Sequence, residues 1–287
     1  MAGRAKTVIG PLQYKGVMDQ SARAGGSSPE AGSEPGGSLT RRSFEHQAGL
    51  FSGSGSVFGR SFLSVLEWLE PLSPDWIALD VACGAAHVAQ EVAPRVRQVV
   101  GVDLTPALLS LAAARLAAAG IRNVLLQQGD AAAMPFIDGA FDLVVCRAAL
   151  HHFSDPAVQL AEMARVCRPG GRVVVSDMLA PGTADWAAFD ALHRTIDPSH
   201  ARCLLDAEMS ALMTTHVGTV TQRTEPGLTY TLPVEAFLTG AGRPDAALAA
   251  LRAELAGGPR TGFRPADTGA GITVTFDRAI MTSSRAG

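Results

Sequence analysis

The sequence predicts an α/β protein with a doubly wound, mostly parallel sheet and helices on both of its faces. Between residues 77 and 177, five short apolar segments alternate with segments of helical periodicity. Residues that favour helix starts and stops stand between them. Strands that alternate with helices in this way build parallel sheets through right-handed crossovers. A chain of 287 residues, 47% of them hydrophobic, is long enough to bury one such core.

Local sequence signals place the individual elements of this sheet. The five strands are expected at residues 77–82, 98–103, 124–128, 141–146 and 172–177. Thr105 and Pro106 should cap and open a helix that ends before Gly120. Asp155-Pro156 should begin another helix, which stops before the turn at residues 168–171.

Beyond the fifth strand the pattern loosens. Residues 183–215 look helical, with a break at Asp197-Pro198. Ser199 or His200 is expected to start the second of these helices, and His200 is also a candidate for lining an acceptor pocket. Two further strands are expected at residues 219–224 and 272–281.

The domain organisation follows from composition. Between Ser21 and Gly37, eleven of seventeen residues are Gly, Ser or Pro, and such a stretch cannot bury enough apolar surface to offset its ordering entropy. We therefore expect a disordered tail followed by one domain, with a core flanked by two lid segments. The boundaries are 1–42 for the tail, 43–287 for the domain, 75–180 for the core, and 44–70 and 183–216 for the lid.

Charge and cysteine usage exclude several classes of partner. A formal net charge of −3 argues against a nucleic-acid surface and against an electrostatic membrane anchor. No apolar run reaches the length of a membrane span, and the first twenty residues lack the order of a secretory signal. The four cysteines form no C-x-x-C pair, and no Cys/His cluster has zinc spacing. A cytoplasmic protein without a metal is expected, either as a monomer or as a homodimer.

Acidic residues stand at the ends of three neighbouring strands, where parallel sheets bind their ligands. Asp80 and the small-residue turn of Ala82, Cys83, Gly84 and Ala85 end the first strand. Asp103 ends the second strand, where a carboxylate can accept both hydroxyls of a ribose. Asp130 follows the third strand, and three acids there favour a neutral or cationic ligand over a pyrophosphate. The G-x-G-x-x-G sequence of nicotinamide enzymes is not present.

These residues, with several later motifs, resemble the class I methyltransferases that use S-adenosylmethionine (SAM). The resemblance is to the branch that includes quinone C-methyltransferases and many natural-product methyltransferases, and it covers about residues 75–180. The matching segments are Leu79-Asp80-Val81-Ala82-Cys83-Gly84, Val102-Asp103, Gly129-Asp130-Ala131-Ala132-Ala133-Met134-Pro135-Phe136, Phe141-Asp142-Leu143-Val144-Val145-Cys146, Leu150-His151-His152-Phe153 and Arg168-Pro169-Gly170-Gly171.

The resemblance implies a fold, a cofactor and residue roles. The fold would be a seven-stranded, Rossmann-like sheet with an antiparallel last strand and a variable helical lid. SAM would be the cofactor and S-adenosylhomocysteine its product. The turn from Asp80 would lie at the methionine half of SAM, Asp103 on the ribose, Leu104 beside the adenine, and Asp130 with Ala131 at its amino edge.

One departure from the family pattern falls in the first turn. Glycine is usual at the positions of Ala82 and Ala86, and only Gly84 is retained here. We expect a small backbone adjustment to accommodate the added methyl groups.

The candidates for chemistry follow the fourth strand. His151 and His152 lie beside the expected methyl position, where an imidazole can serve as a base, although both are also typical packing residues of this family. Arg147 either contacts the methionine half of SAM or is solvated. The amine-methylating sequence Asn-Pro-Pro-Tyr is absent after this strand, so an oxygen or carbon acceptor is favoured.

Three functions compete at this point. The first is methyl transfer from SAM to a small organic acceptor of aromatic or polyketide-like type. The second keeps the fold and the cofactor but runs another tailoring reaction, such as a cyclisation or rearrangement. The third is a binding scaffold without catalysis, which three retained strand-end acids disfavour, because an empty carboxylate cluster is costly.

Overall fold

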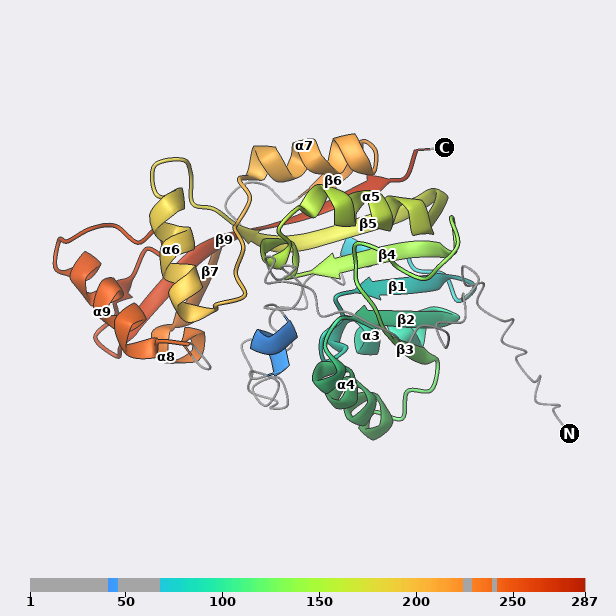
Figure 1. Ribbon diagram of the computed structural model, residues 1–287, viewed down its shortest axis with the longest axis horizontal. Helices are drawn as coiled ribbons and strands as arrows, with labels where there is room; N and C mark the ends of the chain where they lie inside the picture. Colours follow the sequence, from blue (N-terminus) through green and yellow to red (C-terminus); the bar gives the residue numbers. More distant parts are fainter. Residues whose placement is uncertain (1–40, 46–67, 224–228, 239–241, 287) are drawn as a thin grey trace, which may run out of the picture.

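The computed structural model describes residues 41–45, 68–223, 229–238 and 242–286, which fold into two lobes joined by long strands (Figure 1). The large lobe contains five parallel strands. They are β1 (Ile77–Val81), β2 (Gln98–Asp103), β3 (Val124–Gln128), β4 (Phe141–Arg147) and β5 (Cys167–Leu179). The continuous path through the sheet is β3-β2-β1-β4-β5-β9-β6.

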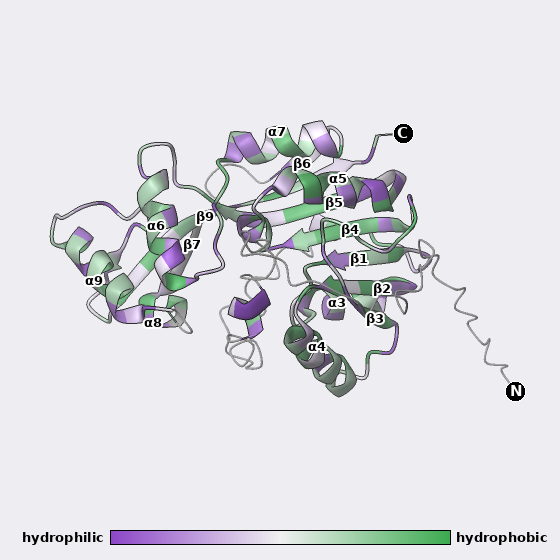
Figure 2. Ribbon diagram, in the orientation of Figure 1, coloured by the Kyte–Doolittle hydropathy of each residue, from purple (hydrophilic) through white to green (hydrophobic). Residues whose placement is uncertain are grey.

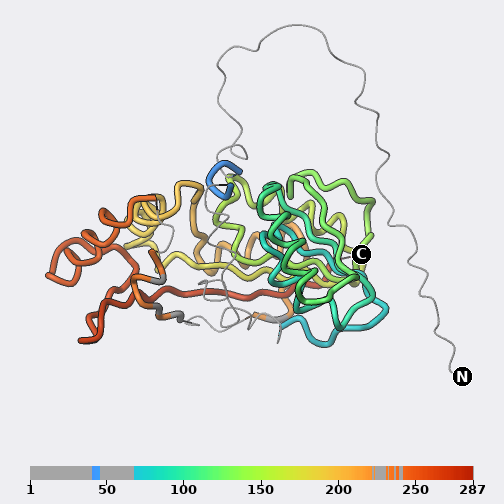
Figure 3. The backbone as a smooth tube through the Cα atoms, turned by 90° about the horizontal axis from the view of Figure 1, so that it is seen from below, coloured from blue at the N-terminus to red at the C-terminus, as the bar shows by residue number. Residues whose placement is uncertain are grey.

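The last strand, β9 (Ile272–Ser284), runs antiparallel to β5, as predicted. β6 (Val220–Arg223) pairs with the end of β9 and is therefore parallel to β5. The first half of β9 pairs instead with β7 (Thr229–Pro233) and β8 (Ala266–Asp267). Figure 3 shows β9 running from the small lobe into the large one. The expected seven-stranded path is thus present, and two short strands extend it.

Helices cover both faces of the large sheet. α3 (His87–Val92) and α4 (Pro106–Ala118) pack on one face, while α5 (Pro156–Val166) and α7 (Asp206–His216) pack on the other. Two short 3-10 turns accompany them, η3 (Ala93–Arg95) and η4 (Leu150–His152). The side chains of β4 alternate between two apolar clusters, one for each face, so its apolar run is explained by double burial (Figure 2).

The small lobe has an apolar core of its own. The small lobe consists of α6 (Trp186–Ile196), α8 (Val234–Phe237), α9 (Pro244–Leu255), β7, β8 and the first half of β9, and its core is formed by residues of the three helices, of β9 and of the connecting segments. Phe189 stacks on Phe263 at a centroid distance of 4.2 Å, and both rings are fully buried. The elements β7, β8, α8 and α9 were not predicted from the sequence. No helix in the described part of the chain has both the length and the apolar character needed to cross a bilayer.

The helices α4 and α5 begin at the predicted cap residues, but one predicted capping hydrogen bond is not made. Asp155 caps α5 by accepting the backbone N–H of Ala157. Thr105 occupies the cap position of α4, yet its side chain makes no capping hydrogen bond. The carboxylate of Asp103 accepts the Thr105 backbone N–H instead, at 2.8 Å. The capping role predicted for Thr105 is therefore wrong, and Asp103 supports the start of this helix.

Two other expectations change with the structure. Neither Ser199 nor His200 begins a helix, because both lie in the loop between α6 and α7, which starts at Asp206. α7 packs against α5 and β9 on one face of the large sheet, whereas α6 packs against α9 in the small lobe. The predicted tail up to residue 40 and the first lid segment from 46 to 67 fall outside the described residues, whereas 41–45 form a helical turn.

Candidate active site

The turn after β1 has an unusual backbone that faces open space. Ala82, Gly84 and Ala86 all adopt left-handed angles, with φ of 54°, 52° and 60°. Glycine reaches this region without steric cost, whereas alanine does not. A Cβ atom built on Gly84 would meet no atom within 4 Å. The turn therefore presents bare backbone to a free volume, as a ligand cradle requires.

Asp103 links this turn to the end of β2. One of its carboxylate oxygens accepts the N–H of Gly84 at 2.8 Å, and the other accepts the N–H of Thr105 at 2.8 Å. Each oxygen of a carboxylate has two acceptor sites, so each retains one for a further donor. The side chain is buried, and burial raises its pKa above the ordinary value of 3.8. A fixed, desolvated acceptor of this kind suits a pair of hydroxyl donors.

Asp80 lies one strand away and is also buried. Its carboxylate accepts the N–H of Ala89 at 3.0 Å. Burial raises its pKa from 3.8 to about 7, against the opposing effects of that hydrogen bond and of the charge on Arg147. Arg147, at the end of β4, is thus the cation that acts on Asp80.

The remaining predicted residues divide between packing and exposed positions. The Sγ atom of Cys83 lies over Gly101, where a Cβ would approach it to 2.9 Å, so Cys83 fills space. Ala85 packs with Leu108 beside Phe44, and Ala131 is buried in the sheet core. Leu104 is half-buried and Asp130 is exposed. The carboxylate of Asp130 accepts the N–H of Ala132 at 2.8 Å.

Comparison with known proteins identifies this arrangement. Residues 79–175, which contain the turn, both buried acids and Asp130, match the family described as a methyltransferase domain. The chain is 40% identical to the uncharacterized methyltransferase YcgJ of Bacillus subtilis over 125 residues, which is 43% of this chain and 49% of YcgJ. The YcgJ crystal structure superposes with a TM-score of 0.70 at 24% identity, covering 79% of this chain and 99% of that one.

Residues 79–175 are a class I methyltransferase domain. The chain is also 37% identical to a demethylmenaquinone methyltransferase of Deinococcus radiodurans over 117 residues, which is 40% of this chain and 48% of that protein. The [4+2]-cyclase SpnF shares the fold, with a TM-score of 0.60 at 17% identity over 88% of this chain and 97% of its own. The chain spans about half the length of the curated relatives it matches.

SAM is the cofactor that the sequence resemblance implies for a methyltransferase domain, and the residues at the strand ends fit it. The free volume in front of Gly84 leaves room for a ligand that lies against the backbone. Asp103 keeps one acceptor site on each oxygen, an arrangement that suits the two hydroxyls of a ribose. Asp80 adds a buried carboxyl group to the same edge, where a cationic ligand compensates its charge.

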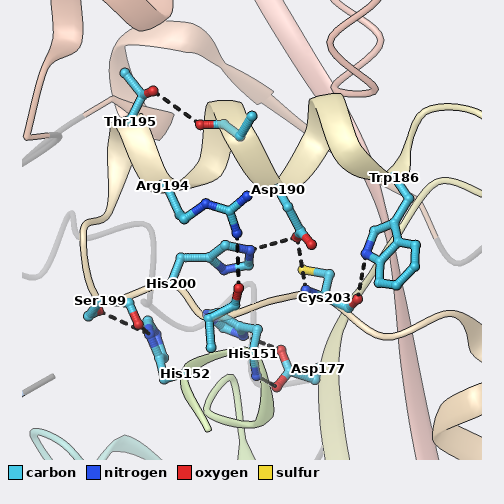
Figure 4. Close-up of polar contacts among 12 residues, drawn as sticks. His151, His152, Asp177, Trp186, Asp190, Arg194, Thr195, Ser199, His200 and Cys203 are labelled. Carbon is cyan, nitrogen blue, oxygen red and sulfur yellow. Dashed lines mark hydrogen bonds and ion pairs between the residues drawn. The ribbon is translucent and has the colours of Figure 1, made fainter. Parts of the chain in front are cut away.

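The two candidate bases of the methyltransferase domain have different environments (Figure 4). His151 is buried, and its Nδ1 lies 2.5 Å from the carboxylate of Asp177 on β5. An ionised carboxylate only accepts hydrogen bonds, so Nδ1 carries the proton and Nε2 the lone pair. Burial lowers the pKa of His151, but the charge of Asp177 and its hydrogen bond outweigh that effect and raise it above 6.5.

His152 is half-buried and belongs to a chain of polar groups. Its Nδ1 lies 3.0 Å from the Oγ of Ser199, which donates to the carboxylate of Asp197 at 2.6 Å. Its ring meets Phe44 edge-on at a centroid distance of 4.9 Å. Burial and the neighbouring charge of His151 lower its pKa to about 3. The imidazole is therefore neutral, with Nδ1 oriented by Ser199.

Sequence reasoning missed Asp190 and His193, and it did not place His200 with them around His151. His193 and Asp190 lie on α6, and His200 lies on the loop that follows it. The Nε2 atom of His200 is 2.7 Å from the carboxylate of Asp190, and the rings of His193 and His200 stack at 3.9 Å. The spacing of Asp190 and His193, one helical turn apart, is the only local signal that points to this cluster.

Proposed function

We propose that the chain transfers the methyl group of SAM to an oxygen or carbon atom of a small organic molecule. The observation that carries this proposal is the pairing of Asp103 with the backbone of Gly84, which fixes a buried acceptor beside an open glycine turn. Matches to methyltransferases over residues 79–175 support it. SAM supplies an already activated methyl group, so the protein chiefly has to hold the acceptor in line with it.

The proposed cofactor contacts come from three strand ends. Asp103 accepts the ribose hydroxyls, while Leu104 and Ala131 border the adenine and Asp130 accepts from its amino group. The turn of Ala82, Cys83, Gly84 and Ala85 lies along the methionine half. Arg147 and Asp80, which interact electrostatically, hold the charged groups at that end.

The acceptor side lies between η4 and the helical turn at residues 41–45. His152 contacts Phe44 there, and its Nδ1 is held by Ser199. When Nδ1 donates to Ser199, Nε2 is the nitrogen left to accept a hydrogen bond from an acceptor hydroxyl and so to orient it. Of the two predicted bases, this geometry favours His152, because His151 is more deeply buried and faces Asp177.

The cofactor assignment is tested by calorimetry of SAM binding. Asp103→Ala should weaken binding by roughly 1–3 kcal/mol, the cost of losing charge-assisted hydrogen bonds. Asp75→Ala, which removes an exposed carboxylate before β1, is the matched control and should leave affinity unchanged. Because Asp103 also accepts the N–H groups of Gly84 and Thr105, circular dichroism must confirm that the variant is folded. Equal affinity in the folded Asp103 variant would refute the ribose assignment.

Methyl transfer is tested separately from binding. Incubation of the chain with methyl-labelled SAM and a panel of phenols, hydroxyquinones and polyketide-like carbon acids should label at least one product. His152→Ala should reduce turnover on hydroxyl acceptors while leaving SAM affinity within twofold. The [4+2]-cyclase SpnF shows that this fold also carries a cyclase. Unlabelled but rearranged products would therefore favour the alternative tailoring reaction over methylation.

A further inference from the structure

We propose that His151, His193 and His200 form a site for a divalent zinc ion at the junction of the two lobes. Each of the three residues offers a ring nitrogen, and these atoms all lie within 4.8 Å of one another. Three imidazoles are a ligand set that zinc commonly takes, with an oxygen donor completing the tetrahedron. The ligands come from η4, α6 and the loop after α6, so His151 lies far before the other two in the sequence. Figure 4 shows His151 and His200 with their carboxylate partners.

Two of the three nitrogens have no hydrogen-bond partner. The Nδ1 atoms of His193 and His200 are buried and unpartnered among the described residues. A buried polar atom without a partner costs about 1–3 kcal/mol. Three histidine rings with exposures of 3 to 8% have no solvent to satisfy these atoms. A metal ion removes this cost by accepting the lone pairs.

The outer hydrogen bonds match those of histidine ligands. A ligating histidine usually donates its other ring N–H to a carboxylate, which fixes the ring orientation. His151 does so to Asp177 at 2.5 Å, which leaves Nε2 for the ion. His200 does so to Asp190 at 2.7 Å, which leaves Nδ1. Both carboxylates are themselves held, by the N–H groups of Met178 and Cys203.

The charges of the cluster also favour a dication. Asp177 and Asp190 are buried, at 2% and 5% exposure, next to rings that can each be neutral. Two buried carboxylates balance the charge of one divalent ion. Phe189 and Phe263 pack edge-on against His193 and enclose the site on the side of the small lobe. The surroundings are therefore apolar on that side, and the two carboxylates compensate the metal charge.

A second group of three possible ligands overlaps this one but fits less well. Asp190, His200 and Cys203 also lie within 4.8 Å of one another. This set contains a single imidazole, and its Asp190 already uses one carboxylate oxygen to accept His200 and the Cys203 N–H. The three-histidine set keeps these contacts intact.

The site has a structural consequence for the two lobes. The backbone carbonyl of His151 already accepts the N–H groups of Ala201 and Arg202, which joins η4 to the loop after α6. A zinc ion bound by these histidines would add coordinate bonds that link η4 to α6 as well as to the loop. It would clamp the small lobe against the edge of the sheet that carries the proposed active site.

The experiment measures zinc on the full chain, purified without a histidine tag and stripped with a chelator. Titration with zinc should show one ion per chain and a dissociation constant below about 1 µM. Cobalt in place of zinc should give the intense visible absorption of a tetrahedral site. A stoichiometry below one tenth, or cobalt spectra of an octahedral aqua ion, would overturn the proposal.

Variants locate the ion. His193→Gln and His200→Gln should each weaken zinc binding by at least about 100-fold, and Asp190→Asn by about 10–100-fold. His216→Ala removes a histidine from α7, outside the cluster, and is the matched control. Circular dichroism establishes that each variant is folded. Equal zinc affinity in the control and in the folded cluster variants would show surface binding and refute the site. The zinc measurement does not depend on SAM binding. The zinc site can therefore be confirmed or refuted independently of the proposed function.

Discussion

Two alanine residues hold backbone angles that glycine adopts at lower cost. Ala82 has φ of 54° and is half-buried, whereas Ala86 has φ of 60° and is fully buried in the core beneath α3. A left-handed angle costs a residue with a Cβ roughly 1–2 kcal/mol. The family prefers glycine at both positions, and the structure gives the physical reason. In this chain the turn has the same left-handed angles with alanine, at the conformational cost given above.

Ala82→Gly should stabilise the protein by about 0.5–1 kcal/mol, because relief of the left-handed angle exceeds the added chain entropy. Ala85→Gly is the control, since Ala85 has no left-handed angle and its buried methyl group packs with Leu108. That variant should be destabilised. Urea denaturation measures both changes, and a loss of stability in Ala82→Gly would contradict the assigned backbone cost.

The raised pKa of Asp80 predicts that the affinity for SAM depends on pH. Its pKa in the folded chain is about 7, raised from 3.8 chiefly by burial. A cationic ligand favours the carboxylate, so binding below pH 7 must release a proton. Affinity should therefore rise between pH 6 and 7, by at most about tenfold per pH unit. Calorimetry in buffers of different ionisation enthalpy detects the proton, and Asp80→Asn should abolish both the slope and the release.

The same shift has a defined sign for stability without ligand. Because the folded state holds its proton more tightly than the unfolded state, the folded chain binds more protons between pH 4 and 7. The contribution of Asp80 to stability is therefore lost as the pH rises through this window. Asp80→Asn should flatten that decline, and an unchanged pH profile of unfolding would argue against a buried, proton-binding Asp80.

At the scale of the elements, the sequence predicts what depends on local pattern. The apolar runs of β1 to β5 and the Asp155 cap are local signals, and the structure confirms those elements. Asp80, Asp103 and Asp130 lie at one edge because parallel strands end together. By contrast, β7 and β8 form only by pairing with β9. The partner residues of β7 in β9 are more than forty residues further along the chain, and those of β8 are only a few residues further. The partners of His151 likewise depend on where α6 packs, which no local spacing records.

One arginine fastens the segment before β1 to β5. The guanidinium of Arg172 donates to the carbonyl groups of Leu69 and Pro71 at 2.6 and 2.7 Å and lies 5.0 Å from the Trp76 ring centroid. Arg172→Ala should destabilise the protein by about 2–3 kcal/mol, because it leaves these carbonyls unpaired. Arg168→Ala removes only a half-exposed ion pair with Asp142 and should cost about 0–1 kcal/mol. Similar losses in the two variants would contradict the fastening role.

At the scale of the whole molecule, the two lobes share one strand, β9. The faces of the large sheet bury two clusters, and the small lobe buries a third, while β9 passes from one lobe into the other. The histidine cluster and the bonds from Ala201 and Arg202 to His151 are among the polar contacts at this junction. The small lobe is therefore expected to open separately from the large one, in line with the usual behaviour of cooperative substructures.

Phe189→Ala tests that separation. Phe189 is fully buried in the small lobe, and its removal should cost about 3–5 kcal/mol there through lost burial and a cavity. Hydrogen exchange should then quicken at the amides of α6 and α9 while β1 and β4 keep their protection. Phe141→Ala, in the core of the large sheet against Phe136, should instead quicken exchange in β1 and β4. A uniform loss of protection in Phe189→Ala would show that the two lobes unfold as one unit. If zinc binding joins the two lobes, adding zinc to the unmodified chain should slow hydrogen exchange in α6.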